Sequence, residues 1–293
     1  MLIANYIFVT NLQLTINHLP FTQMSVPRIS ASSYSNTAPL IWSFLYGTNR
    51  GKYELILDNA PARSAELLAN KRVDAALVPV IAYQLVKNVH LIPDVCVGAK
   101  EKVRSVCLVT KGEDLRDVKT VSLDISSKTS VVLTKIIFRE FLGFEPIYKN
   151  AEPNLNEMLK FADCALLIGD PALVITDLEK PKDKTKFRKF DLVELWQQFT
   201  SFGFVFAMWM TANQTCQIDF ARARDEGLNH LDEIISNYET EINLTHKDFK
   251  KYLSENISYS IDDSMQKGLE LYFELAFKNN LIEKNLPLSF VNY

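Results

Sequence analysis

The sequence predicts an α/β fold with two lobes and a ligand cleft between them. Short apolar strands alternate with helical patterns from Arg28 to about residue 169. At two junctions, 33–40 and 126–130, a strand runs through hydroxyl residues into a helix. Strands separated by helices of about ten to fifteen residues are typical of parallel β-α-β units, whose ligands lie at the carboxyl ends of the strands.

The first series of elements begins after Pro27. Strands are predicted at 28–32, 53–57, 74–80 and 105–109 from their apolar and alternating residues, with Pro79 stopping the third. Helices are predicted after Pro39, which suits a first helical turn, and over 62–68. The residues at 111–114 then break the pattern.

A second series follows the same alternation. It contains a strand at 120–124, a helix at 129–142, a strand at 146–149, a helix at 154–161 and a strand at 164–169. The turn Gly169-Asp170-Pro171 ends the series. The basic residues between 180 and 189 have no surrounding basic face, so we expect a solvated loop there.

The C-terminal part is mainly helical. An unbroken apolar run at 204–210 predicts a buried strand. Amphipathic patterns predict helices at 218–238 and 245–254, and a last long helix capped around 262–264. Short connections near 110–116 and 201–204 divide the chain into one lobe of 25–112 plus 205–293 and a second of 113–204.

Composition excludes several classes of protein. The 293 residues are 47% hydrophobic and 23% charged with a formal net charge of −3, as in an ordinary globular protein without nucleic-acid affinity. The four cysteines (Cys96, Cys107, Cys164 and Cys216) and four histidines show no metal-ligand spacing. We therefore expect no metal, no disulfide, no nucleic-acid partner and a reducing cytoplasm.

Residues 1–23 contain no Lys, Arg, Asp or Glu, and polar residues interrupt their apolar run. A secretory signal needs a basic start, and a membrane span needs about twenty apolar residues. We therefore expect no membrane partner. Residues 1–24 are interpreted as a leader. It is either a disordered tail or the result of a wrongly assigned start, with Met24 as the true first residue.

The first junction contains Ser33, Tyr34, Ser35, Asn36 and Thr37. Small hydroxyl and amide side chains before Pro39 suit a helix cap. The same geometry directs free backbone N–H groups and a positive dipole end at whatever lies above the strand. Both a cap and an anion site fit this pattern.

The second junction repeats the arrangement. Four hydroxyls in five positions, Ser126, Ser127, Thr129 and Ser130, surround Lys128. One cap needs fewer, because one side chain satisfies one or two unpaired donors. The pair of junctions favours a ligand with two separated anionic groups.

Several motifs in order resemble the menaquinone-biosynthesis chorismate dehydratases of the futalosine route. They are Ser-Tyr-x-Asn-Thr-x-Pro-Leu at 33–40, Asp-Ala-Ala-Leu-Val-Pro-Val at 74–80, Arg-Ser-Val-Cys at 104–107, Ser-Ser-Lys-Thr-Ser at 126–130, Leu-Leu-Ile-Gly-Asp at 166–170 and Phe-Val-Phe-Ala-Met-Trp at 204–209. The resemblance runs from about Arg28 to the C-terminus. It implies a cytoplasmic enzyme with the two-lobed fold of type 2 periplasmic binding proteins.

The family's reaction removes water from chorismate, a dicarboxylate, to give 3-[(1-carboxyvinyl)oxy]benzoate without a cofactor. The resemblance implies that Asn36 is catalytic and that the substrate's enolpyruvyl carboxylate is the base. Substrate-binding residues are then expected among Ser33, Tyr34, Thr37, Ser105, Ser126, Ser127, Lys128, Thr129 and Ser130. Ser35 stands where the family more often has Leu, and Lys128 stands where it often has Arg. Lys keeps the positive charge but lacks the planar group with which Arg binds a carboxylate through two hydrogen bonds.

Three points stay open. Asp170 could contact the substrate, act as a base or cap the helix that follows it, and the cap is the preferred interpretation. A non-catalytic anion-binding protein and the sister enzyme that cyclises dehypoxanthine futalosine are alternative functions. A homodimer is an open association state.

Overall fold

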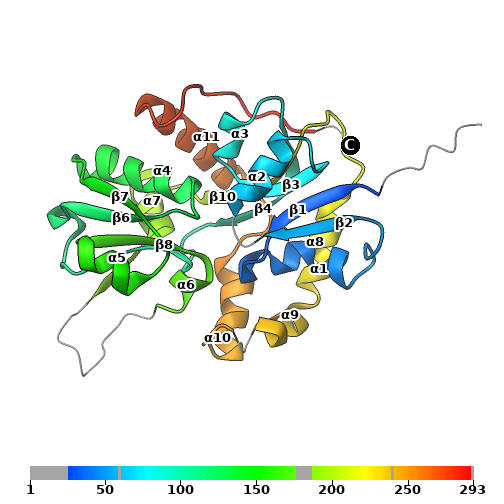
Figure 1. The fold of residues 1–293 in the computed structure, drawn as a ribbon, viewed down its shortest axis with the longest axis horizontal. Coiled ribbons are helices and arrows are strands. Elements are labelled where there is room, and N and C mark those ends of the chain that lie inside the picture. The colour runs from blue at the N-terminus through cyan, green and yellow to red at the C-terminus, as the bar shows by residue number, and fades with distance from the viewer. Residues whose placement is uncertain (1–25, 59–60, 176–186, 239–240, 292–293) are drawn as a thin grey trace, which may run out of the picture.

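The structure, a computed structural model, describes residues 26–58, 61–175, 187–238 and 241–291. In this part of the chain two five-stranded sheets, each flanked by helices, form two lobes side by side (Figure 1). The predicted leader and most of the predicted basic loop lie outside the described residues.

The first sheet has the order β2-β1-β3-β10-β4. Its strands are β1 (Arg28–Ser32), β2 (Glu54–Asp58), β3 (Ala75–Pro79), β4 (His90–Ala99) and β10 (Phe204–Thr211). Strand β1 pairs in parallel with β2 and β3, as predicted. Strand β10 is buried, also as predicted, but it runs antiparallel to β3 and β4.

The second sheet repeats this arrangement in the order β7-β6-β8-β5-β9. Its strands are β5 (Val106–Thr110), β6 (Thr120–Asp124), β7 (Ile147–Ala151), β8 (Cys164–Ile168) and β9 (Arg188–Asp191). Strand β6 is parallel to β7 and β8, whereas β5 is antiparallel to β8 and β9. The prediction of parallel β-α-β units is wrong for β5, because β5 is the strand by which the chain enters the second lobe. Strand β10, for which only burial was predicted, enters the first sheet in the same way.

The sheet to which β5 belongs moves the predicted boundary between the first and the second lobe. Strand β5 belongs to the second sheet, so the chain passes between the sheets within 99–106, before the predicted boundary at 112. The return lies between residues 200 and 204, at the predicted connection. Both crossings are short, which keeps the two sheets close together.

Helices flank both sheets (Figure 1). Those of the first part are the 3₁₀ turn η1 (Ser35–Thr37), α1 (Ala38–Leu45), α2 (Pro61–Ala69) and α3 (Ala82–Leu85). The second lobe has the turn η2 (Leu115–Asp117), α4 (Thr129–Ile136) with its π-helical extension η3 (Ile137–Leu142), α5 (Leu155–Phe161), α6 (Gly169–Leu173) and α7 (Leu192–Thr200). The C-terminal part has α8 (Phe220–Leu228), α9 (Leu231–Tyr238), α10 (His246–Lys251) with its π-helical extension η4 (Tyr252–Asn256), and α11 (Asp263–Lys278).

The sequence patterns missed or merged several elements. The helix predicted over 218–238 is two helices, α8 and α9, separated at Asn229 and His230. Strand β4 was not predicted because Pro93 and the left-handed Asp94 (φ +62°) interrupt its pattern, which an edge strand tolerates. Arg188 and Lys189 form an edge strand rather than part of a loop, and Lys189 Nζ donates to two backbone carbonyls at 2.8 and 3.0 Å.

Helix α11 joins the two lobes. It packs against β10 of the first sheet and against α4 of the second lobe. The buried Tyr272 hydroxyl donates to the Thr129 carbonyl at 3.0 Å. The start of α4, where the second hydroxyl-rich junction lies, is therefore held from behind by the C-terminal helix.

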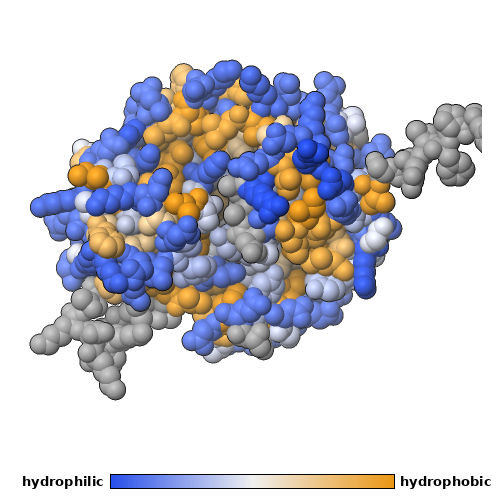
Figure 2. Space-filling model, in the orientation of Figure 1, coloured by the Kyte–Doolittle hydropathy of each residue, from blue (hydrophilic) through white to orange (hydrophobic). Residues whose placement is uncertain are grey.

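The surface mixes hydrophilic and hydrophobic residues (Figure 2). On the face shown, hydrophobic residues gather over β1 and β2 and near α3 and α11, and Leu57 and Leu85 are among the exposed ones. None of the helices in the described ranges is long and apolar enough to cross a membrane.

Candidate functional site

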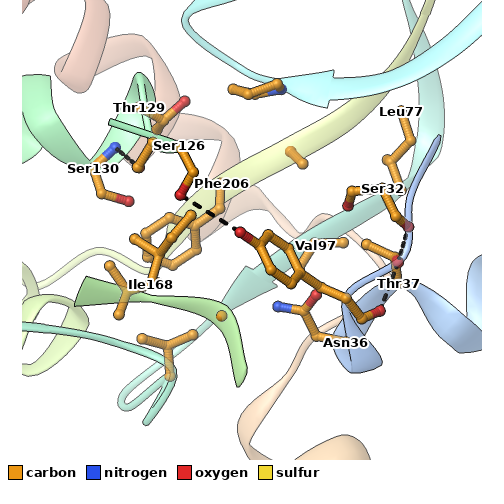
Figure 3. A pocket seen from close by; sticks show the side chains of 17 residues that line it. Ser32, Asn36, Thr37, Leu77, Val97, Ser126, Thr129, Ser130, Ile168 and Phe206 are labelled. Atoms are coloured by element: carbon orange, nitrogen blue, oxygen red, sulfur yellow. Dashed lines mark hydrogen bonds between the residues drawn. The ribbon is translucent and has the colours of Figure 1, made fainter. Parts of the chain in front are cut away.

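A pocket lies between the lobes and takes residues from both (Figure 3). It holds about 610 Å³ of empty space, part of which is open to solvent. Its polar lining residues are Ser32, Tyr34, Asn36 and Thr37 from the first lobe and Ser126, Ser127, Thr129 and Ser130 from the second. The two hydroxyl-rich junctions predicted from the sequence therefore face one cavity.

The first junction turns sharply from β1 through η1 into α1. The Thr37 hydroxyl lies 2.6 Å from the Ser32 carbonyl and 2.7 Å from the Tyr34 carbonyl, so its single hydrogen is used inside the turn. Pro39 lies in the first turn of α1, as predicted. Thr37 thus holds the shape of the turn and contributes mainly its surface to the pocket.

Asp170 of the second lobe binds the first junction. The Ser35 N–H donates to Asp170 Oδ2 at 3.2 Å, and the Ser35 hydroxyl donates to Asp170 Oδ1. The N-cap of α6 is Ile168, so the preferred interpretation of Asp170 as a cap is wrong. The anion held at this helix start is a carboxylate of the protein itself, and burial raises its pKa.

Asn36 follows Ser35 in η1 and lines the pocket (Figure 3). Its side chain is half-buried and lies close enough to the Tyr252 hydroxyl to lower the pKa of that group. A primary amide has two N–H donors and one acceptor. Asn36 can therefore offer both kinds of hydrogen bond to a ligand.

Ser126 is fixed by Asp124, a residue that the sequence reasoning missed. The Ser126 hydroxyl donates to Asp124 Oδ1 at 2.5 Å, and the Ser126 N–H donates to the same atom at 2.9 Å. Burial raises the pKa of Asp124. The Tyr34 hydroxyl in turn donates to Ser126 Oγ at 3.5 Å, across the cleft. Ser126 thus presents an acceptor to the pocket, and its hydrogen is unavailable to a carboxylate.

The hydroxyls of Ser127 and Thr129 differ from that of Ser126. Ser127 Oγ accepts from the Ser130 N–H at 3.2 Å, and Thr129 Oγ1 accepts from the Ile81 N–H at 3.4 Å. As acceptors, both keep their own hydrogen free to donate. The N-cap residue of α4, Lys128, makes no side-chain cap hydrogen bond. The start of α4 therefore offers hydroxyl and backbone donors together with the positive end of a helix dipole.

Four predicted residues lie outside the lining of this pocket, Asp170, described above, among them. Lys128 is exposed and lines a separate depression with Asp124 and Asn150. Ser33 faces another outer depression, and its carbonyl accepts from the Tyr238 hydroxyl at 3.3 Å. Ser105 is fully buried, and its hydroxyl lies 3.5 Å from the Val103 carbonyl.

The remaining walls are apolar. They consist of Leu77, Pro79, Val97, Val103, Val106, Ile168, Phe206 and Ala207, with Gly169 at the edge. Gly169 has φ +64°, and a Cβ there would lie 2.9 Å from the Tyr34 ring. The apolar patterns located these strands but could not show which residues face the cleft. No cluster of three or more candidate metal ligands occurs among the described residues.

The fold resembles that of several solved structures. A structure from Archaeoglobus fulgidus is 16% identical and aligns with a TM-score of 0.64 over 87% of this chain and 98% of that one. The periplasmic aliphatic sulphonate binding protein SsuA from Escherichia coli is 13% identical, with a TM-score of 0.59 over 91% and 94%. A Candida albicans protein with the generic periplasmic binding protein fold is 14% identical, with a TM-score of 0.58 over 92% and 98%. The predicted type 2 periplasmic-binding-protein-like fold is thus confirmed.

Sequence comparison adds a closer relationship. A family described as menaquinone biosynthesis matches residues 27–278. A chorismate dehydratase from Thermus thermophilus is 31% identical over 257 residues, which are 82% of this chain and 92% of that protein. The predicted resemblance is confirmed over nearly the whole length that carried it. This chain belongs to the menaquinone-biosynthesis family.

Proposed function

We propose that this protein is a carbon–oxygen lyase that dehydrates chorismate to 3-[(1-carboxyvinyl)oxy]benzoate in menaquinone biosynthesis. The observation that carries the proposal is the pocket between the lobes, in which the two family motifs at 33–40 and 126–130 face each other. The 31% identity to a chorismate dehydratase supports the same reaction.

One substrate carboxylate binds at the start of α4. Ser127, Thr129 and Ser130 line the pocket there, and the first-turn N–H groups add donors. Hydroxyl and backbone donors can hold a carboxylate without a neighbouring cation. Lys128 lies outside the pocket lining and can act on the substrate only through its longer-range positive charge.

Asn36 acts at the reacting carbons. The reaction removes a proton from the ring carbon that bears the enolpyruvyl ether and expels the neighbouring hydroxyl, which leaves as water while the ring becomes aromatic. An Asn36 N–H donates to the departing oxygen and stabilises the charge that develops on it. Ser126 Oγ, which can only accept while Asp124 holds its hydrogen, suits a substrate hydroxyl rather than a carboxylate.

The proton acceptor is the substrate's own enolpyruvyl carboxylate, and the carboxylic acid so formed passes the proton to the departing hydroxyl, which leaves as water. The side chains that line the described pocket include neither a carboxylate nor an imidazole. Asp170 approaches the first junction, but Ser35 engages both of its oxygens. A base supplied by the substrate fits this neutral lining.

The alternative functions are less well supported. The cyclase that acts on dehypoxanthine futalosine takes a larger substrate that is not a dicarboxylate, whereas this pocket joins a carboxylate-binding helix start to the small polar turn at Asn36. A non-catalytic anion-binding protein shares the fold, but the sequence relative is named for an enzymatic reaction.

We also propose that the protein is cytoplasmic and that it can form a homodimer. The four cysteines are free thiols, and three are buried, which suits the reducing cytoplasm. The exposed Leu57 and Leu85 offer apolar surface for a homodimer. Light scattering of the purified protein across a range of concentrations measures whether a dimer forms.

The test of function is incubation of the purified protein with chorismate, followed by mass spectrometry. We expect a product lighter than chorismate by one water, formed without added metal or nucleotide. A parallel incubation with dehypoxanthine futalosine tests the sister activity. Turnover of that compound with chorismate left intact contradicts the proposal, and so does binding of chorismate without any turnover.

A further inference from the structure

The side chain of Tyr252 ends in an unpaired hydroxyl behind the active-site wall. Tyr252 begins the π-helical segment η4 and is 0% exposed. Its hydroxyl has no hydrogen-bond partner of acceptable geometry among the described residues. Burial of an unpaired hydroxyl is costly and rare in native proteins, so this group calls for a partner that completes it.

Two groups of the proposed active site lie next to this hydroxyl. The side chains of Ser105 and Asn36 are close enough to lower the pKa of Tyr252, which burial nevertheless raises overall. Neither is yet aligned for a hydrogen bond. Ser105 Oγ also lies 3.5 Å from the Val103 carbonyl, at the outer limit of a hydrogen bond. Three polar groups from separate segments therefore meet without a well-aligned hydrogen bond to the Tyr252 hydroxyl.

The ring of Tyr252 is held in place from both sides. The Arg104 guanidinium lies 5.9 Å from the ring centroid, and the Phe249 ring stacks at 6.3 Å with an interplanar angle of 16°. A fixed ring gives its hydroxyl a fixed direction. A small rotation of the Asn36 side chain is then enough to form the missing hydrogen bond.

We propose that Tyr252 is a positioning residue for Asn36. Its O–H donates to Asn36 Oδ1, and the Ser105 O–H donates to the Tyr252 oxygen. Every donor in this chain is then used once, and both N–H groups of the Asn36 amide stay directed at the substrate. The inference rests on the proposed function, since it takes Asn36 as the group at the reacting carbons. It explains why a fully buried Ser105 belongs with the site residues although it does not line the pocket.

The variant Tyr252→Phe removes the hydroxyl and keeps the ring. We expect kcat for chorismate dehydration to fall about five- to tenfold, as for one lost neutral hydrogen bond. The dissociation constant for chorismate, measured by calorimetry, should change less than about twofold, because Tyr252 acts through Asn36. The matched control is Tyr259→Phe, which removes another buried, unpaired tyrosine hydroxyl and should leave kcat unchanged.

The double variant separates positioning from a structural effect. In an Asn36→Ala background, Tyr252→Phe should produce no further loss of rate when product is followed by mass over long incubations. An unchanged kcat in Tyr252→Phe overturns the inference, and so does an equal loss in the Asn36→Ala background. Both results leave the wild-type dehydration intact. A wild-type protein that does not dehydrate chorismate overturns the proposed function itself, and the positioning role with it.

Discussion

The hydroxyl groups around the cleft differ in whether their one hydrogen is free. Thr37 uses its hydrogen inside its own turn, Ser35 donates to Asp170, and Ser126 donates to Asp124. Ser127 and Thr129 accept hydrogen bonds and remain able to donate. The residue types alone could not predict the role of Ser35, because its carboxylate partner, Asp170, lies 135 positions away. Asp124 lies only two positions before Ser126, so a local turn of this kind could have been predicted from the sequence.

Asn36→Ala should lower kcat about a hundredfold or more, as for loss of a donor to a developing charge, with little change in the dissociation constant for chorismate. The reason is that Asn36 contacts the departing hydroxyl, whereas the carboxylate is held at α4. Steady-state kinetics and calorimetry measure the two quantities. A parallel loss of affinity and rate would make Asn36 a binding residue instead.

Ser126 and Ser130 form a matched pair of hydroxyls in the same junction. Ser130→Ala should weaken chorismate binding about ten- to a hundredfold, because it removes a charge-assisted hydrogen bond. Ser126→Ala should cost at most about fivefold, since its hydrogen is directed to Asp124. Calorimetric titration of both variants gives the comparison. Equal losses would show that Ser126 releases its hydrogen to the substrate.

Asp170 should make stability depend on pH. Burial raises its pKa above the usual 3.8, so the folded protein binds this proton at a higher pH than the unfolded chain does. Its contribution to the free energy of unfolding is therefore present below the usual pKa and is lost as the pH rises through the folded value. Urea denaturation of the wild type and of Asp170→Asn from pH 4 to 7, about the range above the usual carboxyl pKa, should show the wild type losing stability relative to the variant. A difference that is constant with pH, or that grows as the pH rises, would mean that Ser35 holds the carboxylate charged.

At the scale of elements, local sequence forms the two hydroxyl-rich helix starts, and residues of the opposite lobe then contact each of them. The strand-to-helix junctions were predictable because hydroxyl residues, Pro39 and the apolar periods lie within a few positions of one another. The contact between Ser35 and Asp170 joins residues 135 positions apart, which no local pattern encodes. The irregular edge strand β4 was missed for a related reason, since its pairing with β10 overrides Pro93 and Asp94.

The start of α6 lies against the first junction, and Gly169 allows this approach. Gly169→Ala and Gly51→Ala both place a side chain at positive φ, at +64° and +77°, and each should lose about 1–2 kcal/mol of unfolding free energy. A Cβ at Gly51 meets nothing within 4 Å, whereas one at Gly169 meets the Tyr34 ring of the other lobe. Opening of the cleft relieves that clash, so only Gly169→Ala should also bind chorismate more weakly. Denaturation and calorimetry on both variants test this, and equal affinities would show that the lobes need not close around the ligand.

At the scale of the whole molecule, the function depends on two lobes between which the chain crosses twice. The chain crosses between them before β5 and again before β10, and α11 contacts both. The two α/β series and the return near 201–204 were evident from the sequence. The placement of β5 in the second sheet was not, because its apolar pattern fits either sheet equally well.

The same architecture brings Asn36 of one lobe and the start of α4 of the other to one pocket. Three hydrogen-bonded pairs around the cleft already join the lobes, Ser35 with Asp170, Tyr34 with Ser126 and Ile81 with Thr129. Closure of the lobes around a ligand is the motion that such two-lobed folds make. Substrate held by both lobes would place its carboxylate and its departing hydroxyl at different walls of the pocket.

A crystal structure of Asn36→Ala with chorismate tests this central claim most directly, because the variant should bind the substrate without consuming it. The account predicts chorismate between the lobes, with one carboxylate at Ser127, Thr129 and Ser130 and the ring hydroxyl towards position 36. Chorismate bound to a single lobe, or in one of the outer depressions with the cleft empty, would contradict it.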